Sequence, residues 1–427
     1  MFRPLTHRIP RRSLHTLGYL PNTTSPLVSS LSFFNSVTGG SADKIPTFRV
    51  LDGVGKPVDG AEMPEIDEAF ARRLYENMQL LPTLDTVLYN VQRQGKISFH
   101  MTSHGEEGTI VGTAAALDNA DEVLGQYREM GVLLWRGFGI DNVMAQCFGN
   151  QDDTSTKGRQ MPVHFGSPKH HFHTISSPLA TQIPQAAGVG YALKRARAQN
   201  IAVCFFGEGA ASEGDFHAGM LLASTIPSPT LFIARNNGFA ISTPSAEQYY
   251  GDGIAARGPG YGIDTIRVDG NDILAVLAAT REARRRTHEQ GRAVLVEAMS
   301  YRVGHHSTSD DSFAYRQRSE VEDRKRIDNP IVRFRLFMES QGWWGAEAEE
   351  ELKARLKADV MKAFKRAEAL PRHELSELFT DVYGGEEPWN ITEQRNELKG
   401  LLKKYGSTWE PWKAELAKFK NKGADMV

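Results

Sequence analysis

Cysteine is nearly absent from this sequence, which contains only Cys147 and Cys204 among 427 residues. A scaffold built on disulfides is therefore excluded, and a reducing compartment is favoured. No run of about 18 apolar residues occurs, which argues against a membrane-spanning helix. The formal net charge of −2 gives no reason to expect nucleic acid or an anionic membrane as partner. A chain of this length can form one large or two medium domains.

Acidic residues are missing from the start of the chain, where the first is Asp43. The preceding segment is rich in serine and threonine and carries Arg3, Arg8, Arg11 and Arg12. This basic, hydroxyl-rich and acid-poor composition is typical of an organelle import sequence. A disordered tail of the same composition remains an alternative, and a secretory signal fits less well because no compact apolar segment follows the arginines. We predict an import sequence and a disordered N-terminus over residues 1–45.

Four apolar segments rich in β-branched residues predict strands, at residues 201–206, 230–235, 264–268 and 293–299. Helices are predicted between them, at Pro178–Arg197, at Ala210–Ser224, and after Asp272, which can cap its helix. Strands that alternate with helices predict an α/β fold, a parallel sheet with helices on both faces. Ligands on such sheets bind beyond the carboxyl ends of the strands.

Two of the predicted strands end in polar turns that suit a metal and a phosphate group. Gly207-Glu208-Gly209-Ala210 follows the first strand, and Asn236-Asn237 follows the second. Glu208, Asn237 and the main-chain carbonyl of Phe239 can offer the oxygen ligands that Mg²⁺ prefers, with diphosphate oxygens completing its shell. Glycines and the start of a helix let the backbone approach an anion. A lone Gly-Glu-Gly is weak evidence, but the pairing with Asn-Asn makes the pattern specific.

Strand patterns stop after about residue 330, and charged helical patterns follow at 347–370 and 391–404. We therefore predict four regions. They are the import sequence and disordered N-terminus at 1–45, an N-terminal helical arm at 46–90, a diphosphate-binding α/β domain at 91–330, and a helical C-terminal extension at 331–427.

Together with further motifs, this unit resembles the alpha-subunit family of thiamine diphosphate-dependent branched-chain 2-oxo acid dehydrogenases. The resemblance covers roughly residues 70–425 and implies the thiamine-diphosphate-binding fold. The other matching motifs are Gly125-Gln126-Tyr127-Arg128-Glu129, Lys157-Gly158-Arg159-Gln160-Met161-Pro162-Val163-His164, Ile175-Ser176-Ser177-Pro178-Leu179-Ala180-Thr181-Gln182 and Tyr301-Arg302-Val303-Gly304-His305-His306-Ser307-Thr308-Ser309-Asp310-Asp311.

The resemblance also implies which residues hold the cofactors. Arginine suits phosphate because its planar fork pairs with phosphate oxygens. Cofactor contacts are implied at Tyr127, Arg128, Ser177, Gly209, Ala210, Arg235 and His306. Magnesium ligands are implied at Glu208, Asn237 and the carbonyl of Phe239, where the family more often has tyrosine. A structural potassium site is implied at Ser176, Pro178, Thr181 and Gln182.

The loop after the last predicted strand carries the candidate catalytic residue. His306 lies on a Gly-Ser-Thr-Asp-rich loop, and an imidazole can donate to a developing anion or shuttle a proton. In the family the matching histidine assists decarboxylation and transfer to a lipoyl group. The family is inhibited by phosphorylation at the serine matching Ser307, and a phosphate beside Asp310 and Asp311 would repel them. The second family phosphosite aligns with Gln317, which cannot be phosphorylated.

The resemblance implies oxidative decarboxylation of branched-chain 2-oxo acids, with the acyl group passed to the lipoyl arm of an acyltransferase core. Only one diphosphate-type module is evident, so we predict that the glutamate activating the pyrimidine lies on a beta subunit, in an alpha2beta2 heterotetramer. Thiamine diphosphate, Mg²⁺ and K⁺ are the predicted cofactors, and a kinase and phosphatase the predicted regulators. The mitochondrial matrix is the predicted location. The alternatives are a pyruvate dehydrogenase alpha subunit, a non-catalytic interaction protein with a thiamine-type fold, and a nucleotide-binding protein, although no Gly-Lys-Ser/Thr phosphate loop is found.

Overall fold

The computed structural model describes residues 27–33, 44–381 and 383–420. Most of the predicted import sequence lies outside these residues. In the described part the main sheet has eight strands, paired in parallel in the order β1-β2-β9-β10-β6-β5-β3-β4. Their bounds are β1 Leu27–Val28, β2 Thr47–Phe48, β3 Glu122–Leu124, β4 Phe172–His173, β5 Ala202–Gly207, β6 Thr230–Asn236, β9 Asp264–Asp269 and β10 Val294–Met299.

The four predicted strands are confirmed and form the centre of the sheet as β5, β6, β9 and β10. Each consists almost wholly of buried residues because helices cover both faces, which explains why these segments read as continuous apolar runs. The outer strands β1 to β4 are two or three residues long. They were not predicted, because so short a segment shows no alternation of apolar and polar residues.

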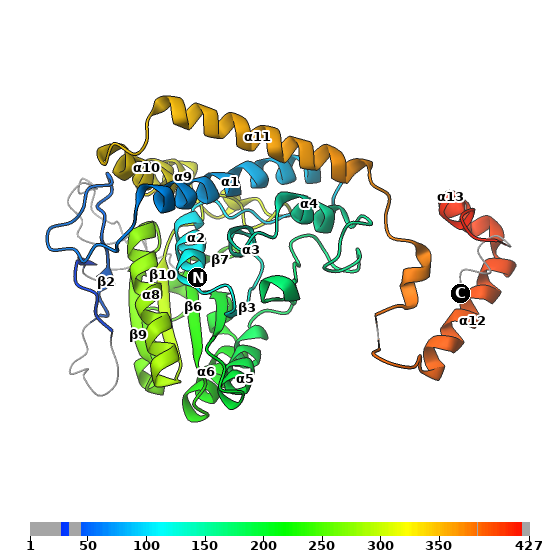
Figure 1. Ribbon diagram of the computed structural model, residues 1–427, viewed down its shortest axis with the longest axis horizontal. Helices are drawn as coiled ribbons and strands as arrows, with labels where there is room; N and C mark the ends of the chain where they lie inside the picture. The colour runs from blue at the N-terminus through cyan, green and yellow to red at the C-terminus, as the bar shows by residue number, and fades with distance from the viewer. Residues whose placement is uncertain (1–26, 34–43, 382, 421–427) are drawn as a thin grey trace, which may run out of the picture.

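Helices pack on both faces of this sheet (Figure 1), which confirms the predicted α/β architecture. Phe206 and Phe232 face α5 and α6, whereas their strand neighbours Phe205 and Ile233 belong to the core shared with α1, α2 and α8. The helices are α1 Glu68–Arg93, α2 Glu107–Ala116, α3 Met130–Trp135, α4 Ile140–Phe148, α5 Gln182–Arg195, α6 Gly214–Thr225, α7 Ser245–Gln248, α8 Ile273–Gln290, α9 Arg318–Ile327, α10 Pro330–Ser340, α11 Ala346–Ala369, α12 Trp389–Lys404 and α13 Lys413–Leu416.

Two predicted helices differ from the structure at their N-termini. The first was expected from Pro178, but α5 begins at Gln182, because the preceding turn holds Ala180 in the left-handed conformation at a φ of 67°. The second was expected from Ala210, but a 3₁₀ turn, η3 (Ala210–Ser212), comes before α6. The backbone of Glu213 is extended between them. The third prediction is confirmed, since the Asp272 carboxylate accepts hydrogen bonds from the first amides of α8.

The C-terminal region is helical, as its charge pattern predicted. The long α11 runs beside α1 (Figure 1), and the two meet where the Tyr75 hydroxyl donates to the Glu349 carboxylate at 2.8 Å. Beyond α11 the chain leads to α12 and α13, which stand apart from the sheet and pack on their own small apolar cluster around Leu402 and Leu416. The domain boundaries drawn from the sequence stay predictions.

Candidate functional site

The carboxyl ends of β5 and β6 bring two of the predicted metal ligands together. Gly207 pairs with Arg235 across the strands, so Glu208 and Asn237 emerge at the same edge of the sheet. Both side chains approach one backbone group, the amide of Phe239. This amide donates to Oε1 of Glu208 and, at 3.3 Å, to Oδ1 of Asn237. The turn continues into a short antiparallel hairpin of β7 (Phe239–Ala240) and β8 (Thr243–Pro244).

A cavity of about 320 Å³ lies at this edge of the sheet. It gathers most of the predicted cofactor and magnesium residues, although they come from four distant parts of the chain. The predicted residues that line it are Tyr127, Arg128, Glu208, Gly209, Arg235, Asn237, Phe239 and His306. Ala210, Ser177 and the four predicted potassium ligands are not part of this lining.

Two buried carboxylates organise the cavity and were missed by the sequence analysis. Glu106 accepts from Nη1 of Arg235 at 2.5 Å and from Nδ2 of Asn237 at 2.7 Å. Glu129 lies 2.6 Å from Nε of Arg235 and also accepts the backbone amide of Arg128 at 3.1 Å. Burial raises the pKa of Glu106, but Arg235 and Arg128 outweigh it and hold the pKa below its usual value. Glu106 therefore stays charged, and the two side chains together hold Arg235 in place.

The contact with Glu106 also orients the amide of Asn237. Its Nδ2 donates to Glu106, which leaves Oδ1 on the side of Glu208. Burial, together with the negative charge of Glu106, raises the pKa of Glu208 to about 7. A divalent cation between the two oxygens would reverse that effect, since it favours the charged carboxylate. Among the described residues no cluster of three or more His, Cys, Asp or Glu could hold a metal.

His306 enters the cavity from the loop that follows β10. Its Nδ1 lies 3.3 Å from Nη2 of Arg128 and 3.4 Å from Nη1 of Arg302. Guanidinium groups only donate, so Nδ1 is the acceptor and Nε2 carries the proton. Burial, followed by the charges of Arg128 and Arg302, lowers the pKa of His306 to about 2. The imidazole is therefore neutral and offers one N–H to a ligand.

The His306 loop is held by hydrogen bonds within itself. The backbone amide of His306 and the hydroxyl of Tyr315 both donate to Oδ2 of Asp310, at 2.8 and 2.7 Å. Arg302 in turn donates to the Tyr315 hydroxyl at 2.6 Å. Ser307 is only 7% exposed. Its hydroxyl accepts from the amide of Ser309 at 3.2 Å, so an enzyme acting on Ser307 must first open the loop.

Ser177 and the predicted potassium ligands lie around the turn that leads into α5. The Ser177 hydroxyl is 2.7 Å from Nε2 of His164, a contact that the sequence analysis missed. The Thr181 hydroxyl donates to the carbonyl of Pro178 at 3.2 Å, and the Gln182 amide donates to the carbonyl of Phe205 at 3.0 Å. Hydroxyl and carbonyl oxygens are thus available in this turn. The roles assigned to these residues stay predictions.

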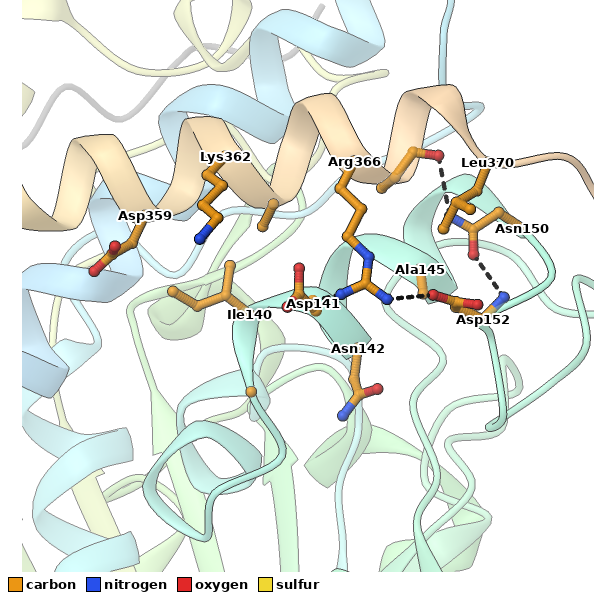
Figure 2. A pocket seen from close by; sticks show the side chains of 13 residues that line it. Ile140, Asp141, Asn142, Ala145, Asn150, Asp152, Asp359, Lys362, Arg366 and Leu370 are labelled. Carbon is orange, nitrogen blue, oxygen red and sulfur yellow. Dashed lines mark hydrogen bonds and ion pairs between the residues drawn. The ribbon is translucent and has the colours of Figure 1, made fainter.

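A larger hollow, of about 790 Å³, lies between α4 and α11 and contains none of the predicted site residues. In Figure 2 Arg366 reaches from α11 toward Asp141 and Asp152. It pairs with Asp152 at 2.8 Å and with Asp141 at 3.5 Å. The charges at the centre of this hollow, on Arg366, Asp141 and Asp152, are therefore already paired with one another. The cavity around Glu208 is the better candidate site. Within the described segments no helix is long and apolar enough to cross a membrane.

The family model and the relatives that match this chain all belong to one class of dehydrogenase component. Residues 75–376 match the family described as "Dehydrogenase E1 component". The mitochondrial 2-oxoisovalerate dehydrogenase subunit alpha of Homo sapiens is 52% identical over 396 residues, which cover 92% of this chain and 87% of the relative. The same subunit of Macaca fascicularis is also 52% identical, over 92% of this chain and 87% of the relative. That of Caenorhabditis elegans is 49% identical, over 92% of this chain and 90% of the relative.

Proposed function

Because this chain belongs to the dehydrogenase E1 component family, we propose that it is the alpha subunit of a mitochondrial 2-oxo acid dehydrogenase that acts on 2-oxoisovalerate. The reaction is the oxidative decarboxylation of branched-chain 2-oxo acids. The observation that carries the proposal is the cavity in which Arg128, Arg235, Glu208, Asn237 and His306 meet. The pyruvate-specific and non-catalytic alternatives have no comparable support, since the relatives are named for 2-oxoisovalerate.

The residues of the cavity fit thiamine diphosphate, the cofactor of this family. Arg235 is buried and lines the cavity, yet its Nη2 has no hydrogen-bond partner among the described residues. An unpaired guanidinium nitrogen costs free energy when buried, and a diphosphate oxygen would satisfy it. Arg128, Tyr127 and the main chain at Gly209 and Ala210 would complete the contacts. Ser177, oriented by His164, is a further candidate contact.

Once bound, the cofactor supplies an electron sink that allows a 2-oxo acid to lose carbon dioxide. This chain holds and orients the reactants. His306, protonated on Nε2, can donate a hydrogen bond to an oxygen of the substrate, while Arg128 and Arg302 hold its ring from behind. The neutral ring adds no positive charge to a cavity that two arginines, Arg128 and Arg235, already line. We expect His306 to assist both the decarboxylation and the transfer of the acyl group to a lipoyl arm.

The metal sites are a further part of the proposal. Mg²⁺ would be held by Glu208, by Oδ1 of Asn237 and by the main-chain carbonyl of Phe239, with diphosphate oxygens completing its coordination. K⁺ would be held in the turn before α5. Its ligands there would be Ser176, Pro178, Thr181 and Gln182.

An alpha subunit requires a beta subunit, and we place the pyrimidine-activating glutamate on that chain, in an alpha2beta2 assembly. A lipoyl-bearing acyltransferase core would accept the acyl group, and a kinase and phosphatase acting on Ser307 would regulate the reaction. The mitochondrial names of the relatives agree with the predicted import sequence. The chain is therefore assigned to the mitochondrial matrix and to branched-chain amino acid catabolism.

The test is co-expression with a candidate beta chain and measurement of carbon dioxide released from 3-methyl-2-oxobutanoate and from pyruvate. We expect activity with the branched substrate only when both chains, thiamine diphosphate and Mg²⁺ are present. Greater activity with pyruvate would favour the pyruvate-specific alternative.

A matched variant tests the cavity itself. Glu208→Gln keeps the size of the side chain but removes its charge, so it should raise the Mg²⁺ concentration needed for activity. Glu350→Gln on α11 is the control, because that side chain is 81% exposed and lies outside the cavity lining, and it should behave like the wild type. Calorimetry showing no uptake of thiamine diphosphate by the wild-type assembly would refute the proposal.

A further inference from the structure

A buried aspartate–histidine pair lies behind the candidate site, and no role proposed above uses it. Asp85 projects from the middle of α1, and His100 follows the end of that helix. Both side chains have 0% exposure, and Nε2 of His100 lies 2.9 Å from Oδ1 of Asp85. Since a carboxylate only accepts, His100 donates through Nε2. The other oxygen of Asp85 accepts the backbone amide of Ser103 at 2.6 Å. The pair thus fixes the shape of the segment 100–104.

This segment holds the His306 loop through the backbone of His100. The amide of His100 donates to the hydroxyl of Thr308 at 3.1 Å, and the amide of Thr308 donates back to the carbonyl of His100 at 3.0 Å. A third hydrogen bond joins the amide of Val303 to the carbonyl of His104 at 3.0 Å. The two ends of the loop segment 303–308, which contains His306, are therefore both attached to the segment 100–104.

The same segment also positions Arg128. The carbonyl of Thr102 accepts from Nη1 of Arg128, and the Ser103 hydroxyl donates to the backbone carbonyl of Arg128 at 3.4 Å. Nη2 of Arg128 then donates to the backbone carbonyl of His306 at 2.8 Å. The segment therefore reaches His306 along two routes, one through Thr308 and one through Arg128.

Close packing leaves little freedom between the two segments. A Cβ added at Gly304 would lie 2.5 Å from the Thr102 hydroxyl, and one added at Gly105 would meet the backbone of Tyr301. Any change in the path of residues 100–104 must therefore displace the loop. Burying a carboxylate is costly unless it is paired, and Asp85 obtains both of its partners from this one segment.

We propose that Asp85 and His100 are positioning residues, which hold the segment 100–104 in the shape that places His306 in the cavity, with Arg128 behind its ring. The inference goes beyond the proposed decarboxylation and rests on it for its kinetic test alone. Neither residue touches the cavity, so their effect is on the rate of the chemical step and not on substrate binding.

The first test is Asp85→Asn in the heteromer assembled with the beta chain. Asparagine keeps the volume of the side chain but has only one accepting oxygen for the two donors, His100 and Ser103. Its NH2 group must face one of these N–H groups, or force the His100 ring into the other tautomer, whose Nδ1–H has no described partner. Misplacement of a reacting group by about 1 Å costs up to about 100-fold in rate, so we expect kcat to fall about 10- to 100-fold. KM for 3-methyl-2-oxobutanoate should not change. Hydrogen exchange of the amides in 303–308 should rise on the order of fivefold, the effect of losing one hydrogen bond.

Tyr75→Phe is the matched control, because Tyr75 is on the same helix, is fully buried, and loses a hydrogen bond to Glu349 that is remote from the loop. It should leave kcat and the exchange of 303–308 unchanged. A second pair of variants avoids α1 altogether. Thr308→Val removes the acceptor of the His100 amide and should lower kcat as Asp85→Asn does. Thr308→Ser keeps that oxygen and should have the kcat of the wild type.

The proposal is overturned if Asp85→Asn changes kcat and loop exchange no more than Tyr75→Phe does, or if Thr308→Val and Thr308→Ser are equally active. If Asp85→Asn fails to fold, the Thr308 pair decides. If the wild-type heteromer lacks decarboxylase activity, the proposed function is wrong, but that result does not decide the positioning role of Asp85 and His100. The exchange of residues 303–308 then decides the positioning role.

Discussion

At the scale of single residues, the charge state of His306 follows from what surrounds its ring. A histidine in water titrates near pH 6.5, but this ring is largely buried and faces two cations, Arg128 and Arg302. Both effects favour the neutral form. Nδ1 is occupied by the arginines, so the ring offers a single donor, Nε2, in a defined direction. A neutral donor of this kind can stabilise a developing oxyanion without first losing a proton to solvent.

The lowered pKa of His306 predicts how the reaction depends on pH. The pKa of His306 is lowered to about 2, so the residue stays neutral over the whole range in which the enzyme can be assayed. His306→Gln should lower kcat by about 10²- to 10³-fold, the usual contribution of one donor to a developing oxyanion. Profiles of log kcat against pH for the variant and the wild type should nevertheless have the same shape between about pH 6 and 9. An inflection near pH 6.5 that is present only in the wild type would show that His306 titrates.

At the scale of elements, the loop 303–312 combines the candidate donor and the candidate phosphorylation site. Ser307 is buried, and its neighbours include Asp310, which accepts from the amide of His306. A negative charge on Ser307 therefore cannot be accommodated without breaking contacts that position His306. The same burial means that a modifying enzyme could reach the Ser307 hydroxyl only in a loop conformation other than this one.

We predict that Ser307→Glu abolishes decarboxylation by the heteromer and leaves the fold intact. The new carboxylate would be buried next to Asp310 and Asp311, so the loop must move away from the cavity. Activity and circular dichroism measured on the same preparation would test both parts. Ser309→Glu is the control, because Ser309 is exposed only two residues further on and should keep activity. Normal turnover in Ser307→Glu would contradict the proposed regulatory role.

The central strands and the position of Glu208 and Asn237 at one sheet edge could be predicted, because parallel strands end at the same edge and both segments read as buried strands. The partners Glu106, Glu129 and Asp85 could not. Each is buried by contacts with residues distant in sequence, such as Arg235 for Glu106, and local patterns carry no record of such contacts. The start of α5 was placed too early for a related reason. Pro178 is a common helix start, but here the turn it begins holds Ala180 at positive φ.

At the scale of the whole molecule, the fold buries acidic side chains whose pKa values are shifted in opposite directions. Glu106, Asp269 and Glu297 have a lowered pKa because buried arginines outweigh the effect of burial. Their contribution to stability is present above about pH 4–5 and is lost as the pH falls. Glu107 differs from them. Burial raises its pKa to about 8, and no arginine is among the largest influences on it from the described residues. It is protonated in the folded protein at pH 6 but ionised in the unfolded chain.

Glu107 should therefore make the free energy of unfolding fall as the pH rises. The contribution of its raised pKa is fully present below the unfolded value of about 4.5 and is lost as the pH rises through about 8. Glu107→Gln keeps an oxygen that can accept the Gly105 amide, now 2.9 Å from Oε2, but it cannot ionise. We expect its thermal midpoint, relative to the wild type, to rise steadily between about pH 4.5 and 8, the range bounded by those two pKa values. Glu350→Gln is the control, because that side chain is 81% exposed and should shift the midpoint equally at every pH. A constant difference for Glu107→Gln would mean that Glu107 is ionised in the folded chain and has a compensating partner.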